Sequence, residues 1–217
     1  TGVGRYLANV LRIWSGEYGH YDYEVYFRNE ISQDPFLSTS CFSSTMVPNS
    51  RIFDLGPVWE NIYLPKALKK NQDADVYFSP LYTLPAFPLN FKKVVTIFDI
   101  SYIAHPEWFP KRQLASLRLL TGPTVKKADA ILTGSEATKK EILKYYNVSD
   151  QKIHVTNLGV EEKFLDLEKK TSDTHLEELK VKYKLSGKVI LFVGLIMNRR
   201  NVPVLMESVS EVMKQTG

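Results

Sequence analysis

Apolar residues recur with two different periods along this chain of 217 residues. Near the N-terminus, Val3, Leu7, Val10, Leu11 and Trp14 follow the spacing of one face of an amphipathic helix. This helix begins almost at the glycines of the opening sequence TGVGRY. The pattern therefore predicts a glycine turn and a helix that form one unit.

Six short segments are instead rich in the β-branched and aromatic residues that favour strands. They are Tyr23–Arg28, Ala74–Ser79, Val94–Phe98, Ala130–Gly134, Ile153–Asn157 and Val189–Gly194. Several are apolar on both faces, which is typical of strands buried in a parallel sheet. Helical patterns separate the later segments, at Lys111–Lys127, Glu136–Tyr146 and Pro203–Lys214. The alternation predicts an α/β fold with a doubly wound, Rossmann-like parallel sheet.

The strand pattern is interrupted between Glu161 and Lys188, where charged residues dominate. A new apolar segment then begins at Val189. We expect an N-terminal domain at residues 1–160, a linker at 161–187, and the start of a second Rossmann-like domain at 188–217.

Composition narrows the class of protein. Hydrophobic residues make up 44% and charged residues 24%, values that are ordinary for folded soluble domains. The net charge of +4 is below that of a dedicated nucleic-acid binder, so we expect no nucleic-acid partner. Cys41 is the only cysteine, which excludes an intrachain disulfide and a thiolate metal cage and favours the reducing cytoplasm. The longest apolar run, Val189–Met197, is too short to span a bilayer.

Polar residues follow the predicted strands at the carboxyl edge, where sheets of this kind bind ligands. The positions with this placement are Ser79, Asp99, Ser101, Ser135 and Asn157. A carboxylate such as Asp99 at the end of a buried strand is costly unless it is hydrogen-bonded or functional. The alternative is that Asp99 caps the next turn, since Asp and Ser accept backbone N–H groups readily.

The opening glycines form a second candidate site. Gly2 and Gly4 allow the backbone to approach a ligand, and the free N–H groups at the start of the helix favour an anion such as a diphosphate. The alternative is a tight turn that holds no ligand.

Two adjacent arginines form a third candidate site, in the segment FVGLIMNRRN. Arg199 and Arg200 precede Asn201, which can cap a helix that begins near Pro203. Guanidinium groups beside a helix N-terminus suit a diphosphate. The alternative is a pair of solvated charges.

Five motifs in this order resemble the retaining GT-B glycosyltransferases of family four, the "group 1" class, and especially their mannosyltransferase-like members. The matching segments read TGVGRY, VVTIFDISYIAHPEWFP, ADAILTGSEATKKEI, NLGV and ILFVGLIMNRRN. The resemblance covers nearly the whole chain. It implies a first strand before Thr1 and further βα units after Gly217, so that the chain is a fragment of a GT-B protein, truncated at both ends.

The resemblance also implies roles for particular residues. Gly2, Gly4, Arg199 and Arg200 match positions that hold the diphosphate of the donor. Arg200 stands where the family usually has lysine.

The catalytic position implied by the resemblance is the pair Phe98 and Asp99. The family has histidine and aspartate here, so Phe98 replaces the imidazole and leaves only its backbone carbonyl for a polar role. Tyr82, Ser101 and Ser135 match the side of the site that faces the acceptor.

A retaining hexosyltransferase is the activity that the resemblance implies, with mannose or glucose moved from a nucleotide sugar such as GDP-mannose or UDP-glucose to a glycan or lipid-linked acceptor, as in polysaccharide biosynthesis. No metal and no further cofactor are implied. Two alternatives stay open. One is a degenerate module that binds a sugar or a partner without turnover, which Phe98 favours, and the other is a GT-B nucleotide-sugar epimerase.

A basic segment adds one possible partner. Arg112, Arg118, Lys126 and Lys127 lie in the predicted helix at Lys111–Lys127. Such side chains suit a peripheral contact with an anionic membrane. The alternative is a solvated helix face.

Overall fold

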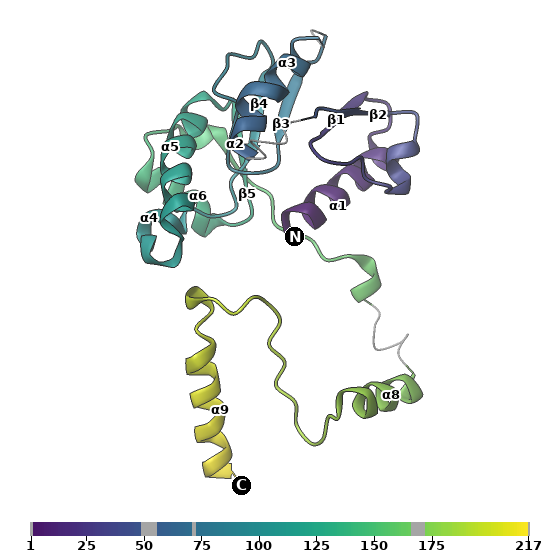
Figure 1. The fold of residues 1–217 in the computed structure, drawn as a ribbon, viewed down its shortest axis with the longest axis vertical. Coiled ribbons are helices and arrows are strands. Elements are labelled where there is room, and N and C mark those ends of the chain that lie inside the picture. The colour runs from purple at the N-terminus through teal and green to yellow at the C-terminus, as the bar shows by residue number, and fades with distance from the viewer. Residues whose placement is uncertain (1, 49–55, 71–72, 166–171, 217) are drawn as a thin grey trace. The chain divides into compact units, whose positions relative to one another are not determined.

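The computed structural model describes residues 2–48, 56–70, 73–165 and 172–216 (Figure 1). The chain divides into two compact units. The first unit comprises Thr1–Pro106 and Pro110–Leu158, and the second comprises Glu107–Phe109 and Gly159–Gly217.

Most of the regular structure lies in the first unit. Its strands are β1 (Tyr23–Phe27), β2 (Phe42–Met46), β3 (Val76–Ser79), β4 (Lys92–Thr96), β5 (Ala130–Thr133) and β6 (Ile153–Val155). Its α-helices are α1 (Gly2–Glu17), α2 (Gly56–Val58), α3 (Leu64–Leu68), α4 (Ser101–Ala104), α5 (Lys111–Lys127) and α6 (Glu136–Tyr145). Short helical turns lie at Pro35–Ser38, Trp59–Tyr63 and Asp150–Lys152, and a further turn, Pro106–Trp108, begins at the boundary with the second unit.

Strands β3 to β6 form one sheet in the order β3-β4-β5-β6, and every pair is parallel. The prediction of a parallel α/β sheet is therefore confirmed, and the arrangement is compatible with a Rossmann-like fold. The crossover from β4 to β5 contains α5, and the crossover from β5 to β6 contains α6. The carboxyl ends of these strands lie at one edge, as the sequence pattern indicated.

The core of the first unit is formed by apolar side chains of the predicted strands and helices. Val95 and Ile97 of the β4 region, Ile131 of β5, Val125 of α5 and Ile142 of α6 are all completely buried. Side chains from strands and helices thus exclude water together, and burying one such residue contributes about 1.5–3 kcal/mol. The helix periods predicted at Lys111–Lys127 and Glu136–Tyr146 are confirmed by α5 and α6.

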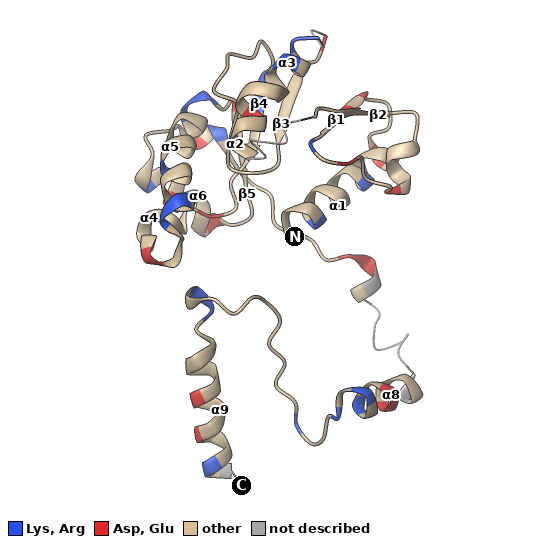
Figure 2. Cartoon of the chain, viewed as in Figure 1, with Lys and Arg blue, Asp and Glu red and all other residues tan. Residues whose placement is uncertain are grey.

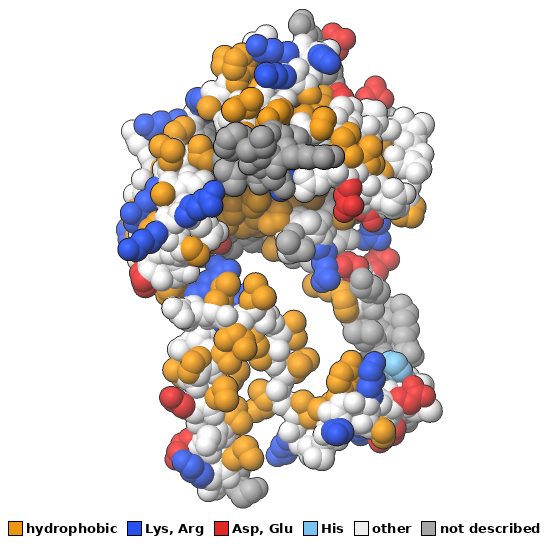
Figure 3. All heavy atoms as spheres, viewed as in Figure 1, with side chains coloured by type: hydrophobic (Ala, Val, Ile, Leu, Met, Phe, Trp, Pro, Cys, Tyr) orange, Lys and Arg blue, Asp and Glu red, His pale blue; other side chains and the backbone are white. Residues whose placement is uncertain are grey.

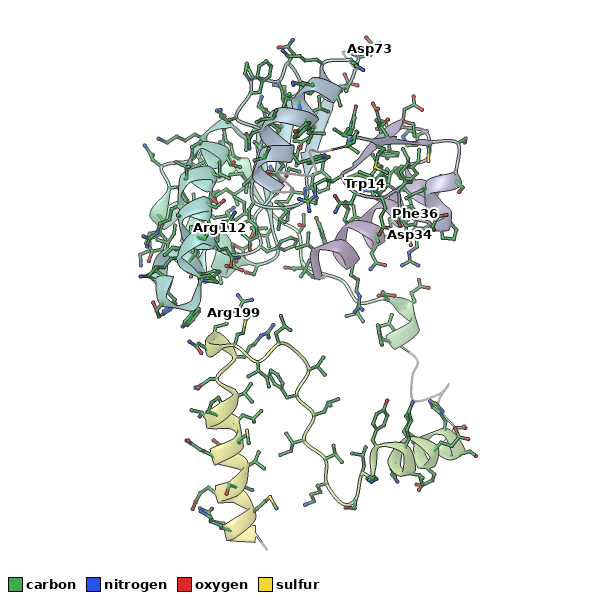
Figure 4. All side chains as sticks on the ribbon, in the orientation of Figure 1. Trp14, Asp34, Phe36, Asp73, Arg112 and Arg199 are labelled. Atoms are coloured by element: carbon green, nitrogen blue, oxygen red, sulfur yellow. The ribbon has the colours of Figure 1, made fainter. Side chains whose placement is uncertain are left out.

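Helix α1 belongs to a smaller cluster with β1 and β2, which pair in parallel. The ring of Trp14 stacks on Tyr23 at 5.4 Å between centroids, and Phe36 packs against Phe42 at 6.0 Å. Figure 4 labels Trp14 on α1 and Phe36 in the turn that precedes β2. Trp14 also lies 5.7 Å from Phe78 of β3, which connects this cluster to the four-stranded sheet.

The second unit contains the helices α8 (Asp173–Tyr183) and α9 (Val202–Thr216) and the short turns Glu162–Phe164 and Asn198–Arg200. Helix α8 lies within the range that the sequence suggested as a linker. Among the described residues, no helix combines the length and the hydrophobicity that crossing a membrane requires.

The strand predicted at Val189–Gly194 is wrong. The segment is irregular, and none of the described strands pairs with it. Most of its side chains are exposed, including Leu191 at 79% and Val193 at 78%. An apolar β-branched segment becomes a strand only when a neighbouring strand accepts its backbone hydrogen bonds and covers its side chains.

Candidate functional site

The candidate site lies at the carboxyl edge of the four-stranded sheet, where the loops after β3, β4 and β5 meet. We call it the carboxyl-edge site and define it by Tyr82, Phe98, Asp99, Ser101 and Ser135. These are the predicted catalytic and acceptor-side residues of the first unit, and hydrogen bonds place them in two small groups.

Asp99 is the centre of the first group. Its Oδ1 accepts hydrogen bonds from the backbone N–H of Ser101 at 3.1 Å and from the Ser101 hydroxyl at 2.7 Å. Its Oδ2 accepts a hydrogen bond from the phenol of Tyr82 at 3.1 Å. Both carboxylate oxygens are therefore engaged, and Asp99 orients the start of α4 while it holds Tyr82. The capping role considered for Asp99 is present, together with a long-range contact that capping alone does not need.

Tyr82 reaches Asp99 from a backbone conformation that bulky residues rarely adopt. Its φ is 49°, in the left-handed region. Its backbone N–H donates to the carbonyl of Thr96 at 2.9 Å, and the buried hydroxyl of Ser79 donates to the carbonyl of Thr83 at 2.6 Å. These bonds hold the turn after β3 beside β4. Strain of this kind persists only where the surroundings enforce it, and it concentrates at functional sites.

Ser135 and Phe98 form the second group through Thr138. The hydroxyl of Ser135 accepts a hydrogen bond from the backbone N–H of Thr138 at 3.2 Å and caps α6. The hydroxyl of Thr138 donates to the carbonyl of Phe98 at 3.1 Å. The Phe98 carbonyl is thus engaged with the protein itself. Sequence reasoning missed Thr138, because its partner Phe98 is 40 positions away and no local pattern relates the two.

Helix α1 contributes its N-terminal turns to this edge. The ring of Tyr6 lies 5.1 Å from the ring of Phe98, nearly perpendicular to it. Gly2 and Gly4 precede Tyr6 in the same helix. The structure therefore brings the predicted glycine segment close to the end of β4. A Cβ added at Gly2 would meet nothing within 4 Å, so packing alone does not require glycine there.

Arg199 and Arg200 lie in the second unit, in the helical turn Asn198–Arg200. Both side chains are exposed, and the Nε of Arg199 donates to the Sδ of Met197 at 3.2 Å. Figure 4 labels Arg199 at the turn that precedes α9. Asn201 adopts a left-handed conformation with φ 48°, and its carbonyl accepts the N–H of Leu205. The two arginines are thus adjacent to the start of a helix of 15 residues, as the sequence indicated.

Glu60 is a half-buried carboxylate near the carboxyl-edge site that sequence reasoning missed. Its Oε2 accepts a hydrogen bond from the hydroxyl of Thr83, which follows Tyr82 in the turn after β3. Burial raises the pKa of Glu60, while the Thr83 hydrogen bond and the charge of Arg28 oppose this shift. A Glu within the otherwise apolar segment PVWENIYLP was the available signal.

The raised pKa of Glu60 leads to a prediction about stability. A carboxyl group with a raised pKa in the folded state destabilises the protein as pH rises above the ordinary value of 4.5. We expect Glu60→Gln to increase the free energy of unfolding at pH 7 by about 1 kcal/mol, a typical size for a single substitution. The gain should vanish well below pH 4.5, where the carboxyl group of Glu60 is protonated in both the folded and the unfolded protein. Urea denaturation at the two pH values measures it.

Glu30→Gln provides the matched control, because Glu30 is exposed in a loop of the same unit. It should leave the free energy of unfolding nearly unchanged at both pH values. A loss of stability in Glu60→Gln at pH 7 would contradict the prediction, and would show that the charge of Glu60 is needed beside Arg28.

Comparison with known proteins gives no relative: no family model matches the sequence, and no curated protein matches it.

Proposed function

We propose that this chain is part of a retaining GT-B glycosyltransferase that moves a mannose or glucose unit from a nucleotide sugar to a glycan or lipid-linked acceptor. The five ordered motifs support this proposal. One structural observation also supports it. The ring of Tyr6 packs against Phe98, so the glycine segment at the start of α1 lies beside the carboxyl-edge site.

The chemistry that we propose depends on placement and charge. The acceptor hydroxyl attacks the anomeric carbon from the face that the diphosphate leaves, and the departing phosphate accepts the hydroxyl proton. The positive end of the α1 helix dipole suits an anion such as a diphosphate. In the second unit, the guanidinium groups of Arg199 and Arg200 suit an anion of the same kind. A nucleotide sugar such as GDP-mannose or UDP-glucose is the donor.

Asp99 acts in this proposal as a positioning residue. Its two oxygens already accept hydrogen bonds from Ser101 and Tyr82, so it holds the loop ends of β3 and β4 in a fixed relation. Substrate hydroxyl groups then meet a preformed edge, and correct placement of reacting groups supplies much of an enzyme's rate enhancement.

A second candidate function is a module that binds a sugar or a partner without turnover. Phe98 favours it, because a phenyl ring occupies the position of an ionisable imidazole and its carbonyl is engaged by Thr138. Under either function we place the protein in the cytoplasm, with peripheral contact at the cytosolic face of a membrane.

A donor panel tests the transferase proposal. The protein is incubated with GDP-mannose, UDP-glucose and related nucleotide sugars, and release of the nucleoside diphosphate is measured with and without glycan and lipid-linked acceptors. We expect one donor to be consumed in an acceptor-dependent reaction, with the anomeric configuration retained in the product by NMR. Saturable binding of a sugar with no turnover for any donor would favour the binding module. Inversion of the anomeric configuration would reject the retaining mechanism.

A further inference from the structure

Helix α5 carries a charge pattern that the proposed transfer reaction does not use. Of the 28 lysines and arginines in the chain α5 holds five, and it holds none of the 24 acidic residues. The rest of the chain therefore has 23 basic and 24 acidic side chains. The basic character of the protein thus arises from this one helix. The other long helices, α1, α8 and α9, each contain at least one acidic residue.

The basic residues of α5 are positioned toward solvent. Thr121, Thr124 and Val125 form the buried face of the helix. Arg112, Leu119 and Lys126 follow one another at intervals of seven residues and are all exposed. Residues seven apart lie on nearly the same side of a helix, so these three form a stripe about 21 Å long.

Leu119, in the middle of this stripe, is 73% exposed. A single exposed leucine is ordinary, but here a basic residue lies two turns away on each side, Arg112 and Lys126. Lys111 and Arg118 flank the stripe and are also exposed. The ion pairs given for the described residues include none of these basic side chains. We call the surface formed by Lys111, Arg112, Arg118, Leu119 and Lys126 the α5 face.

Lys127, at the end of α5, differs from the others. Its Nζ donates to the carbonyl of Ala86 at 2.9 Å and so holds the loop before β4 against the helix. This contact and the buried Thr124, which accepts the backbone N–H of Leu84 at 3.0 Å, fix α5 on the first unit. The α5 face is therefore presented by a rigidly packed helix. Figure 2 shows lysine and arginine along α5, and in Figure 3 basic side chains gather on the same side of the first unit.

We propose that the α5 face is a docking surface for a bilayer that contains anionic phospholipids. Positive charge without acidic neighbours matches a negatively charged plane of headgroups, and each Lys or Arg near such a surface contributes about 1 kcal/mol. Leu119 enters the headgroup region, as the apolar residues of interfacial helices do. The proposal does not depend on sugar transfer, because membrane binding requires neither donor nor acceptor.

Flotation of the protein with vesicles tests the proposal. One vesicle preparation contains phosphatidylcholine alone, and the other contains phosphatidylcholine and phosphatidylglycerol. We expect the wild-type protein to float with the anionic vesicles only, and less so as salt increases. Arg112→Gln with Lys126→Gln should weaken partitioning by about 30-fold, at 1 kcal/mol for each residue. Leu119→Ser should weaken it with no change in charge.

The matched control is Lys180→Gln with Lys182→Gln on α8, which removes the same net charge from an exposed helix that also carries glutamates. It should float almost as the wild type does, and circular dichroism checks that all variants are folded. Three results would overturn the proposal: no flotation of the wild type, unchanged flotation of the α5 variant, or an equal loss in the α8 control. Binding of a duplex oligonucleotide by a protein that does not float would show that the face takes another polyanion.

Discussion

Alanine at both Arg199 and Arg200 is expected to lower the rate of sugar transfer by about four orders of magnitude. The two residues lie in the turn Asn198–Arg200, directly before helix α9. In the proposed function, two guanidinium groups and the N–H groups at the start of the helix act on the diphosphate of the donor. Charge on the diphosphate increases as the glycosidic bond breaks, so these groups act more strongly on the transition state than on the bound donor.

The size of this effect follows from single substitutions in other enzymes, where loss of one preorganised donor costs about 10²–10³ in rate. Arg200→Lys should be mild by comparison, since the positive charge stays in place. Steady-state kinetics with the donor found by the panel measure both effects. Alanine at both Lys180 and Lys182 is the matched control, because it removes two charges from α8 in the same unit. Near-normal transfer by the Arg199 and Arg200 variant would mean that the diphosphate binds elsewhere.

Replacement of Asp99 by alanine is expected to reduce transfer by about 10²-fold, because it removes the acceptor of three hydrogen bonds at the carboxyl-edge site. The phenol of Tyr82 and the backbone N–H of Ser101 then lose their partner. The left-handed backbone of Tyr82 is also released from a contact that holds it. A displacement of about 1 Å at such a site is enough for a loss of this size.

Tyr82→Phe tests the hydrogen bond to Asp99 while the carboxylate charge stays in place. It removes only the bond to Oδ2 and leaves the bonds from Ser101 to Oδ1 intact. We expect it to lose less activity than Asp99→Ala, with most of the loss in kcat if the turn after β3 orients the acceptor. Thr39→Ala is a control. The Thr39 hydroxyl donates to the carbonyl of Phe36 and contacts the Sγ of Cys41, next to the strand β2 and away from the carboxyl-edge site. If Asp99→Ala kept full activity while remaining folded, Asp99 would serve only as a cap for α4.

Local patterns were sufficient for most long elements of the first unit, whereas β2 and the short helices α2, α3 and α4 were not predicted. Helix α5 begins and ends at the predicted residues Lys111 and Lys127, and the strands at β4, β5 and β6 are parallel as expected. Periodicity carries this information because each helix turn or strand pair buries its own apolar face. The sequence also contained the candidate residues at the strand ends, since a parallel sheet collects these ends at one edge.

Contacts between segments that are distant in the sequence could be identified only from the tertiary structure. Tyr82 and Asp99 are 17 positions apart and Tyr6 and Phe98 are 92 apart, so no local pattern relates them. The same holds for Thr138, whose hydroxyl bonds to the carbonyl of Phe98 across 40 residues. Such partners are selected by the way the strands and helices pack, where a buried polar group must find an acceptor or donor.

The segment Val189–Gly194 shows the limit of local patterns most clearly. By itself this sequence specifies a strand, because it is apolar and rich in β-branched residues. Whether a strand forms depends on a neighbour that accepts its backbone hydrogen bonds, and none of the described strands pairs with it. The sequence alone therefore determined the parallel α/β class, the bounds of α5 and the residues at the sheet edge. Tertiary structure decided the partners of Asp99 and Phe98 and the state of residues 189–194, because hydrogen bonding between distant segments depends on packing rather than on local propensity.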